Sequence, residues 1–302
     1  MSDMFDYSIQ HLAFEPPVKS YSELENINYV TTITGDRIAT RCIGPKGRPY
    51  LRGNAAADSS RFVIFSHGNA DDIGTAEEYM YWFATTFSCN VMTYDYVNYG
   101  CSSRGKTNEA NMHSAVMAVF EYVTMPEHDG GLGVTHDRIM LIGKSLGTAP
   151  TVYLASHLAT TECQQRINGV ILMSPLASGV RALAPVGMAS KRILDVLDSM
   201  FCPSLDLVKK IRVPVFIIHG YEDKVINIVN ARILAHNLHE DASYTPLFVH
   251  AGHNDIEATH PLTMKEYINA FYMHCDTVAK YCLLYTSDAA DEGLGVDLGG
   301  RR

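Results

Sequence analysis

A serine between two glycines, at the point where a buried strand should meet a helix, is the feature of this chain that most restricts its fold. The residues Gly143-Lys144-Ser145-Leu146-Gly147 follow the apolar run Ile139–Ile142 and precede a helical pattern that ends at Leu158. The two glycines remove Cβ atoms that would collide in so tight a turn. The turn would place the serine hydroxyl at a helix N-terminus, where amides can stabilise negative charge. We therefore predict that Ser145 is an exposed nucleophile rather than a helix cap.

An acidic residue and a histidine follow the serine, each just beyond its own predicted strand. The apolar run Val213–Ile218 leads to a turn that contains Asp223, and Pro246–Val249 leads to the loop that contains His253. Open α/β sheets place their ligand sites at the carboxyl ends of the strands, so these side chains should converge on Ser145. The order serine, acid, histidine is that of the α/β-hydrolases. We predict a catalytic triad of these three residues.

Neighbouring residues offer alternatives for two members of this triad. Glu222 could be the acid in place of Asp223, and His250 or His260 could take the place of His253. The glycine before His253 and its position just beyond a strand favour it over the other two histidines. A serine hydroxyl needs such a base within hydrogen-bond reach before it can attack.

Hydrolysis through a serine also needs donors for the oxyanion of the tetrahedral intermediate. One predicted donor is the amide of Leu146, and the other is the amide of Asn69 in the loop after the strand Phe62–Phe65. His67 and Asp95 fall outside the triad order. We expect His67 to hold the oxyanion loop and Asp95 to accept hydrogen bonds from loop amides.

Strand-like and helical patterns alternate along the chain, which predicts βαβ units around a mainly parallel sheet. Beyond the strands already named, the predicted strands are Asn90–Tyr94 and Val170–Met173, after an N-terminal hairpin of Tyr29–Thr34 and Arg37–Cys42. The predicted helices are Thr75–Phe87, Asn108–Val123, Leu146–Leu158, Val229–Leu238 and Pro261–Leu284. We expect one α/β domain over residues 1–284, of the α/β-hydrolase fold, with helices on both faces of the sheet.

Two segments break this alternation. Residues 176–203 contain an apolar set at helical spacing: Ile193, Val196, Leu197, Met200 and Phe201. In this fold a cap over the active site is inserted at that point, so we expect a short cap there. A helix packed on the core is the alternative. Residues 285–302 lack apolar periodicity, and the stretch from Cys282 resembles translated sequencing-adaptor read-through. We expect this end to be a disordered or non-native tail.

Charge and cysteine content argue against several classes of protein. The formal net charge is −9 and no run of five or more basic residues occurs, which argues against nucleic acid as a partner. The seven cysteines are scattered and form no C-x-x-C pair, so neither structural zinc nor a disulfide framework is expected. Free cysteines suit a reducing compartment. No secretory signal and no apolar stretch of about 20 residues occurs. We predict a cytoplasmic protein, with peripheral attachment to membranes as the alternative.

Segments along the whole chain resemble the α/β-hydrolase domain-containing protein 17 group, which are depalmitoylating serine hydrolases that face the cytosol. The matching segments are Leu12–Phe14, Pro16-Pro17, Phe65–Ala70, Tyr94–Tyr96, Tyr99-Gly100, Ser174–Leu176, Ile217–Gly220, Glu222-Asp223 and Gly252–Glu257. The resemblance implies thioesterase chemistry on S-acylated cysteines through an acyl-enzyme, with Ser145, Asp223 and His253 as the triad. It implies no metal and no organic cofactor. The expected substrate is an S-acylated protein or a small acyl ester.

Three features depart from the pattern of that group. Its members have a palmitoylated, cysteine-rich N-terminus, whereas no cysteine precedes Cys42 here. A lysine, Lys144, stands where the group usually has glutamine, which places a cation beside the nucleophile. Asn98 stands where a glycine is usual, and asparagine tolerates the left-handed backbone region better than most residues.

The acyl-transfer machinery is common to several activities of this fold, so the residues alone leave the substrate open. A serine peptidase or a general carboxylesterase is the alternative within the enzymes. A non-catalytic relative that acts as a binding module is the alternative outside them, and the complete set of triad residues argues against it.

Overall fold

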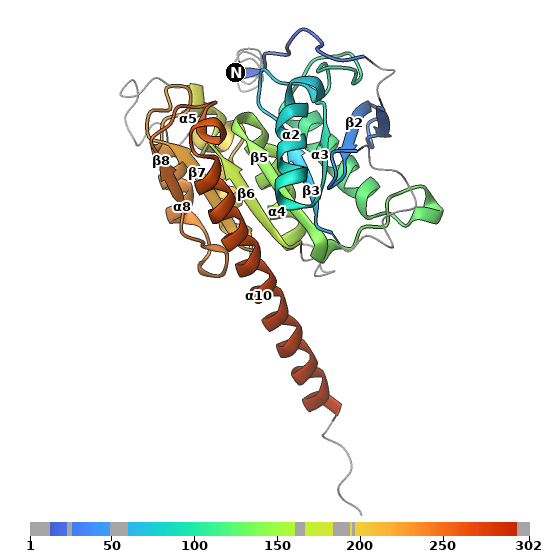
Figure 1. Cartoon of the computed structure of the whole chain (residues 1–302), viewed down its shortest axis with the longest axis vertical. Coiled ribbons are helices and arrows are strands. Elements are labelled where there is room, and N and C mark those ends of the chain that lie inside the picture. The colour runs from blue at the N-terminus through green and yellow to red at the C-terminus, as the bar shows by residue number, and fades with distance from the viewer. Residues whose placement is uncertain are drawn as a thin grey trace, which may run out of the picture.

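Eight strands of the described chain form one sheet through the middle of the molecule, in the order β1-β2-β4-β3-β5-β6-β7-β8 (Figure 1). This computed structural model describes residues 13–22, 26–48, 60–160, 167–183, 194 and 197–294. The strands are β1 (Asn28–Thr31), β2 (Arg37–Ile43), β3 (Phe62–Ser66), β4 (Asn90–Tyr94), β5 (Ile139–Lys144), β6 (Gly169–Met173), β7 (Val215–Gly220) and β8 (Leu247–Val249). Strands β3 to β8 are parallel to one another, and β1 and β2 join antiparallel. The predicted hairpin and mostly parallel sheet are confirmed.

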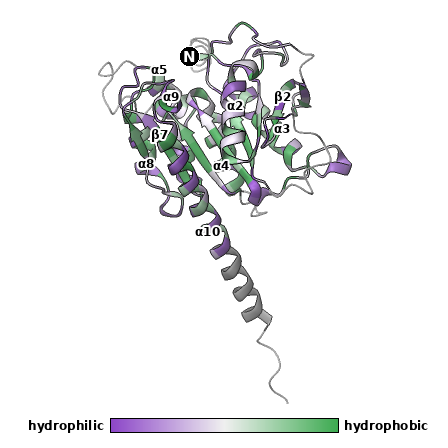
Figure 2. Cartoon of the chain, in the orientation of Figure 1, coloured by the Kyte–Doolittle hydropathy of each residue, from purple (hydrophilic) through white to green (hydrophobic). Residues whose placement is uncertain are grey.

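Helices cover both faces of this sheet, as the alternation of patterns predicts. They are α2 (Ile73–Phe87), α3 (Glu109–Thr124), α4 (Thr148–Thr160), α5 (Gly179–Leu183), α7 (Ser204–Leu207), α8 (Val229–Asn237), α9 (Ile256–Thr259) and α10 (Pro261–Leu294). Helices α2 and α10 pack on one face, and α3, α4 and α8 pack on the other. The central strands are therefore apolar on both sides, which Figure 2 shows as green arrows.

Side chains of each strand alternate between the two cores. In β5, Ile139 and Leu141 belong to the core under α3 and α4, whereas Met140 and Ile142 belong to the core under α2 and α10. Each such side chain, fully buried, stabilises the fold by about 1.5–3 kcal/mol. Since all parallel strands end at the same edge, the loops after β3, β5, β7 and β8 meet there.

Helix α2 begins two residues before the predicted Thr75. Asp72 caps it: the Asp72 side chain accepts from the amide of Thr75, and the Thr75 hydroxyl accepts from the amide of Asp72. This reciprocal pair satisfies main-chain donors that a helix end leaves without partners. In the loop after β4, Asn98 has a φ of 70°, so asparagine does adopt the left-handed conformation expected where a glycine is usual.

Helix α10 ends at Leu294, ten residues after the predicted end at Leu284. The expected boundary of the domain at 284 therefore falls inside this helix. The disordered or non-native character expected of the tail stays a prediction. Residues 285–292 contain neither proline nor glycine, so no strong helix breaker interrupts this stretch. Figure 1 shows this end of α10 extending away from the sheet.

Within the described part of the expected cap, Phe201 packs on the core, whereas Met200 is exposed. Phe201 is 2% exposed, its ring meets that of Phe14 edge to face at 5.8 Å, and its carbonyl accepts from the amide of Gly179. Ile193 and Val196, which belong to the apolar set of the cap, lie outside the described residues. Of the described helices, none combines the length and the apolar character that a membrane span requires.

Candidate active site

The glycine-flanked serine sits in a sharp turn between β5 and α4. Ser145 begins a 3-10 turn, Ser145–Gly147, and its φ of 54° lies in the left-handed region. A Cβ on Gly147 would lie 2.0 Å from the carbonyl oxygen of Ser66, and one on Gly143 would lie 2.6 Å from the carbonyl oxygen of Gly147. Both glycines are therefore required by close approach of the main chain. The strained conformation of Ser145 is of the kind that concentrates at functional sites.

Replacing Gly147 with alanine is expected to lower the free energy of unfolding by about 1–3 kcal/mol or more, because the new methyl group meets main-chain atoms that cannot rotate away. Gly105→Ala is the matched control, since a Cβ there would first meet a methyl group of Val97 at 3.4 Å. Urea unfolding of both variants measures the difference. Equal stability of the two variants would contradict the packing described for the turn.

His253 lies within hydrogen-bond distance of both other residues of the predicted triad. Nε2 of His253 is 2.9 Å from Oγ of Ser145, and Nδ1 of His253 is 2.7 Å from Oδ2 of Asp223. The loops after β5, β7 and β8 supply the three side chains. With Nδ1 donating to the carboxylate, Nε2 is free to accept the proton of the serine hydroxyl. The arrangement can generate a nucleophilic serine.

Asp223 is held on both of its oxygens. Oδ1 accepts from the amides of Val225 at 2.9 Å and Ile226 at 2.8 Å. Oδ2, which accepts from His253, also lies 3.2 Å from Nε2 of His219. Burial by itself would raise the pKa of Asp223, but the hydrogen bonds from His219, His253 and Ile226 hold that pKa well below its usual range. The acid therefore stays ionised at neutral pH and can stabilise an imidazolium on His253.

His219 is a residue of this site that the sequence reasoning missed. It is fully buried at the end of β7, and its Nε2 also lies 2.8 Å from the carbonyl oxygen of Ile226. Both neighbours of Nε2 are acceptors, so this nitrogen carries a proton and donates to them. The signal available in the sequence was its position, four residues before Asp223 at the same strand end.

The alternative acid and bases have other partners. Oε1 of Glu222 lies 2.9 Å from Nδ1 of His250, and both side chains are more than half exposed, at 53% and 81%. Nδ1 of His260 lies 2.8 Å from the hydroxyl oxygen of the neighbouring Thr259. Among the described residues, His253 is the histidine in contact with Ser145.

The loop with the predicted oxyanion donor passes beside the nucleophile. A Cβ on Gly68 would lie 3.8 Å from the Cβ of Ser145. The side chain of Asn69 faces away from the reaction: its Nδ2 donates to Ala13, and its Oδ1 accepts from Tyr99 and from Glu15. Within the described part of the chain, the main-chain amides of Asn69 and Leu146 donate to no protein acceptor. Their role in an oxyanion hole remains a prediction.

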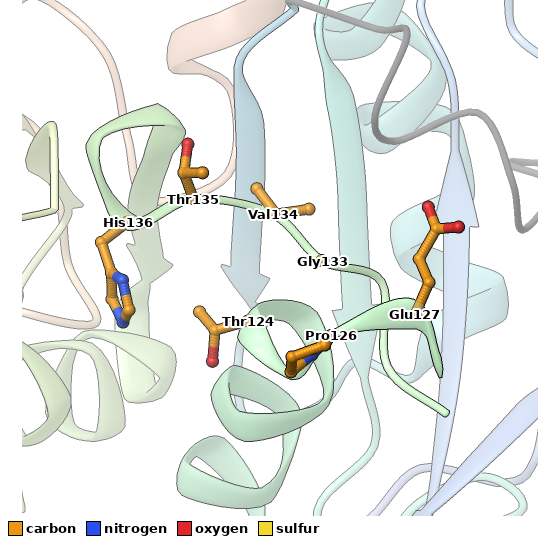
Figure 3. A pocket seen from close by; sticks show the side chains of 7 residues that line it. All are labelled: Thr124, Pro126, Glu127, Gly133, Val134, Thr135 and His136. Carbon is orange, nitrogen blue, oxygen red and sulfur yellow. The ribbon is translucent and has the colours of Figure 1, made fainter. Parts of the chain in front are cut away.

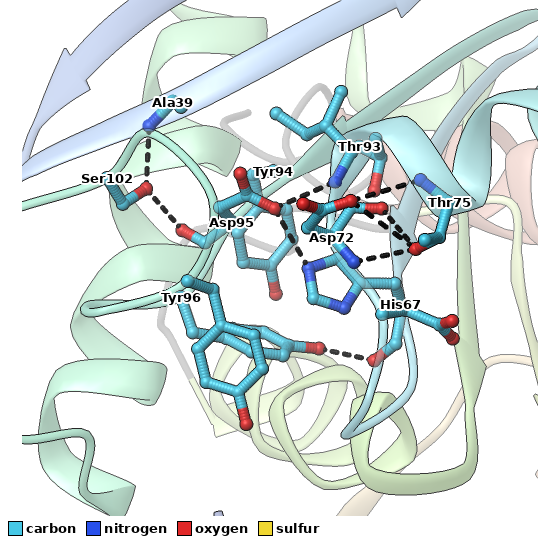
Figure 4. A network of polar contacts seen from close by, with 12 residues as sticks. Ala39, His67, Asp72, Thr75, Thr93, Tyr94, Asp95, Tyr96 and Ser102 are labelled. Carbon is cyan, nitrogen blue, oxygen red and sulfur yellow. Dashed lines mark hydrogen bonds and ion pairs between the residues drawn. The ribbon is translucent and has the colours of Figure 1, made fainter. Parts of the chain in front are cut away.

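A buried polar network around His67 and Asp95 holds this loop in place (Figure 4). Nε2 of His67 is paired with Oδ1 of Asp95 at 3.3 Å, and Nδ1 lies 2.8 Å from the carbonyl oxygen of Gly68. Asp95 also accepts from the hydroxyl of Tyr21 and from the amide of Ile73. Burial lowers the pKa of His67, but Asp95 and the Gly68 carbonyl outweigh it and leave that pKa raised. These contacts support the structural roles expected of His67 and Asp95.

The remaining features of the described residues bear on metal and ligand binding. The described residues contain no group of three or more histidine, cysteine or acidic side chains arranged to hold a metal ion. A surface hollow of about 500 Å³ lies between the end of α3 and the start of β5 (Figure 3), at the edge of the sheet opposite Ser145. It is lined by Thr124, Pro126, Glu127, Gly133, Val134, Thr135 and His136. None of these residues contributes to the triad.

The sequence is similar to those of α/β-hydrolase domain-containing proteins. No family model matches the chain. The α/β-hydrolase domain-containing protein aho-3 of Caenorhabditis elegans is 33% identical over 266 residues, which cover 82% of this chain and 73% of that protein. The α/β-hydrolase domain-containing protein 17C of Xenopus tropicalis is 39% identical over 196 residues, which cover 65% of this chain and 56% of that protein. This chain thus spans little more than half the length of the protein 17C relative.

Solved structures with the same architecture are more distant in sequence. The esterase Pf2001 of Pyrococcus furiosus superposes with a TM-score of 0.62 at 16% identity, over 86% of this chain and 97% of that one. The enol-lactonase of Burkholderia xenovorans LB400 superposes with a TM-score of 0.55 at 15% identity, over 82% of this chain and 100% of that one. At this identity the likeness establishes the fold.

Proposed function

This chain belongs to the α/β-hydrolase domain-containing family of aho-3 and protein 17C, and we propose that it is a serine hydrolase that cleaves long-chain acyl thioesters and esters. The observation that carries the proposal is the continuous hydrogen-bonded chain from Ser145 through His253 to Asp223. A nucleophile, a base and an orienting acid in this order provide what acyl transfer requires. Its relatives identify the protein as a hydrolase of this fold.

In the proposed reaction, His253 takes the proton of Ser145 as Oγ attacks the acyl carbonyl carbon. The amides of Asn69 and Leu146 stabilise the oxyanion that forms, and one such donor is typically worth about 3–4 kcal/mol in the transition state. The bond to the leaving sulfur or oxygen breaks, and the proton on His253 passes to the leaving group. A water molecule, deprotonated by His253, then attacks the acyl-enzyme. The free acid departs, and Ser145 recovers its proton.

The proposed substrate is an S-acylated protein, of the kind implied by the resemblance to the protein 17 group. Phe201 of the cap segment is buried against the core, so this side chain does not line an acyl groove. A general carboxylesterase is the second candidate, because a solved structure with this architecture is an esterase. Cytoplasmic location and peripheral association with membranes are part of the proposal, since acylated proteins are held at membrane surfaces.

Two measurements on the wild-type protein test this proposal. A fluorophosphonate probe is expected to label the protein, with the adduct on the peptide that contains Ser145 by mass spectrometry. Hydrolysis of a palmitoyl thioester is expected to have a higher kcat/KM than that of a short p-nitrophenyl ester. Absence of labelling would overturn the serine mechanism, whereas labelling with a clear preference for the short ester would favour the carboxylesterase.

A further inference from the structure

Lys144, which departs from the family pattern, has a defined place in the structure. It continues the alternation of β5, so that its side chain follows Met140 and Ile142 on the face covered by α2 and α10. There its Nζ lies 3.0 Å from Oε1 of Glu257 in α9. The two side chains are only 17% and 15% exposed. The cation beside the nucleophile is therefore paired, and the pair is mostly removed from water.

A third element, α2, places an aromatic side chain beside this pair. The ammonium of Lys144 lies 5.9 Å from the ring centroid of Tyr79 in α2. The Tyr79 hydroxyl donates to the sulfur of Met173, the residue that pairs with Lys144 across β5 and β6. Burial raises the pKa of Tyr79 far above its usual range, and the charge of Glu257 adds to this shift. Tyr79 is thus neutral, and the two charges balance each other.

The pair joins the two loops that must meet for catalysis. Lys144 precedes Ser145 directly, and Glu257 follows His253 by four residues. Within the loop that carries His253, the amide of Gly252 donates to the Asp255 side chain at 2.6 Å, so this loop is a compact turn. Two contacts therefore connect the turn after β5 to the segment from the His253 loop into α9. They are the Lys144–Glu257 ion pair and the hydrogen bond between Ser145 and His253.

We propose that Lys144 and Glu257 are positioning residues, whose ion pair holds the His253 loop in register with the nucleophile turn. This inference rests on the proposed serine mechanism. A misplacement of about 1 Å between reacting groups can lower a rate by about 100-fold. Loss of one partner would also leave the other charge buried and unpaired, whereas replacement of both by apolar side chains of similar volume is often well tolerated.

The pair has an electrostatic signature that a merely structural contact lacks. In Lys144→Met the unpaired Glu257 carboxylate favours the imidazolium of His253, so the acid limb of the rate profile moves to higher pH. In Glu257→Leu the unpaired ammonium disfavours the imidazolium, so the same limb moves to lower pH. Asp223 and His219 on the β7 side, and Asp255 in the histidine loop, are unchanged in both variants.

The test compares Lys144→Met, Glu257→Leu and the double variant by the rate of fluorophosphonate labelling between pH 5 and 9. Each single variant is expected to label about 10- to 100-fold more slowly, with opposite shifts of the acid limb, and the double variant is expected to recover most of the rate. Lys209→Met is the matched control and should label like the wild type, because Lys209 pairs with Asp206 at an exposed site. The charge-exchanged variant, Lys144→Glu with Glu257→Lys, is measured if a single variant fails to fold.

Three outcomes are distinguishable. If the wild type does not label, the serine mechanism fails and this inference fails with it. If the wild type labels and both single variants label at the same rate with the same profile, the positioning role alone is overturned. If the single variants lose thermal stability but keep the pH profile and rate of the wild type, the pair is only structural, and the inference is likewise overturned.

Discussion

Ser145→Ala is expected to lower kcat for acyl-thioester hydrolysis by about 10⁴- to 10⁶-fold, because the nucleophile is lost while the oxyanion donors and the binding surface remain. The Ser145 hydroxyl makes its hydrogen bond with His253, so its removal leaves the surrounding packing intact. Alanine keeps the Cβ of residue 145, which the left-handed turn already accommodates. Steady-state kinetics and a thermal melt measure the two effects separately, and Tm should change little.

Ser145→Ala also has an internal control. Residues that act as one unit give non-additive losses, so Ser145→Ala combined with His253→Ala should be no slower than Ser145→Ala alone. A further large loss in the double variant would mean that His253 acts on a different nucleophile. Residual activity of Ser145→Ala within about tenfold of the wild type would exclude Ser145 as the nucleophile, since triad serines contribute far more than that.

The parts of this fold that could be predicted are those whose cause is local in the sequence. Parallel strands buried on two faces need continuous apolar runs, and Asn90–Tyr94 was predicted with its observed bounds for that reason. The turn at Ser145 follows from its two flanking glycines between an apolar strand and a helix, and the structure shows that a Cβ at either glycine would meet main-chain atoms. The helix start at Asp72 was missed, since a cap depends on hydrogen bonds that periodicity does not reveal.

The parts that could not be predicted depend on contacts between distant segments. Lys144 and Glu257 are 113 residues apart, and no local pattern pairs them. The role of His219 depends on the way Asp223 turns back toward the end of β7. Phe201 packs against Phe14, a residue of the N-terminal segment far from it in the sequence. In each case the sequence supplied the residue type, and the tertiary structure supplied the partner.

Asp223→Asn is expected to lower kcat by about 10⁴-fold, because an amide cannot accept from both histidines. Its oxygen would still be needed by the amides of Val225 and Ile226, which places the NH₂ group against His253 and His219. His253 would then present its lone pair at Nδ1 and its proton at Nε2, facing Ser145. That tautomer cannot take the serine proton. Steady-state kinetics at pH 7 to 9 measure the loss, and Ser145→Ala provides the lower limit.

The stability of the fold should also depend on pH through the ionisation of Asp223. The pKa of Asp223 is depressed in the folded protein, so its ionisation stabilises the fold above the unfolded value of about 3.9 and this contribution is lost as the pH falls further. The Tm difference between the wild type and Asp223→Asn is therefore expected to narrow below about pH 4.

Glu222→Gln is the matched control for the activity of Asp223→Asn, because Glu222 is exposed and paired with His250. If Glu222→Gln lost activity while Asp223→Asn kept it, Glu222 would be the acid and the hydrogen bond from His253 to Asp223 would not be catalytic.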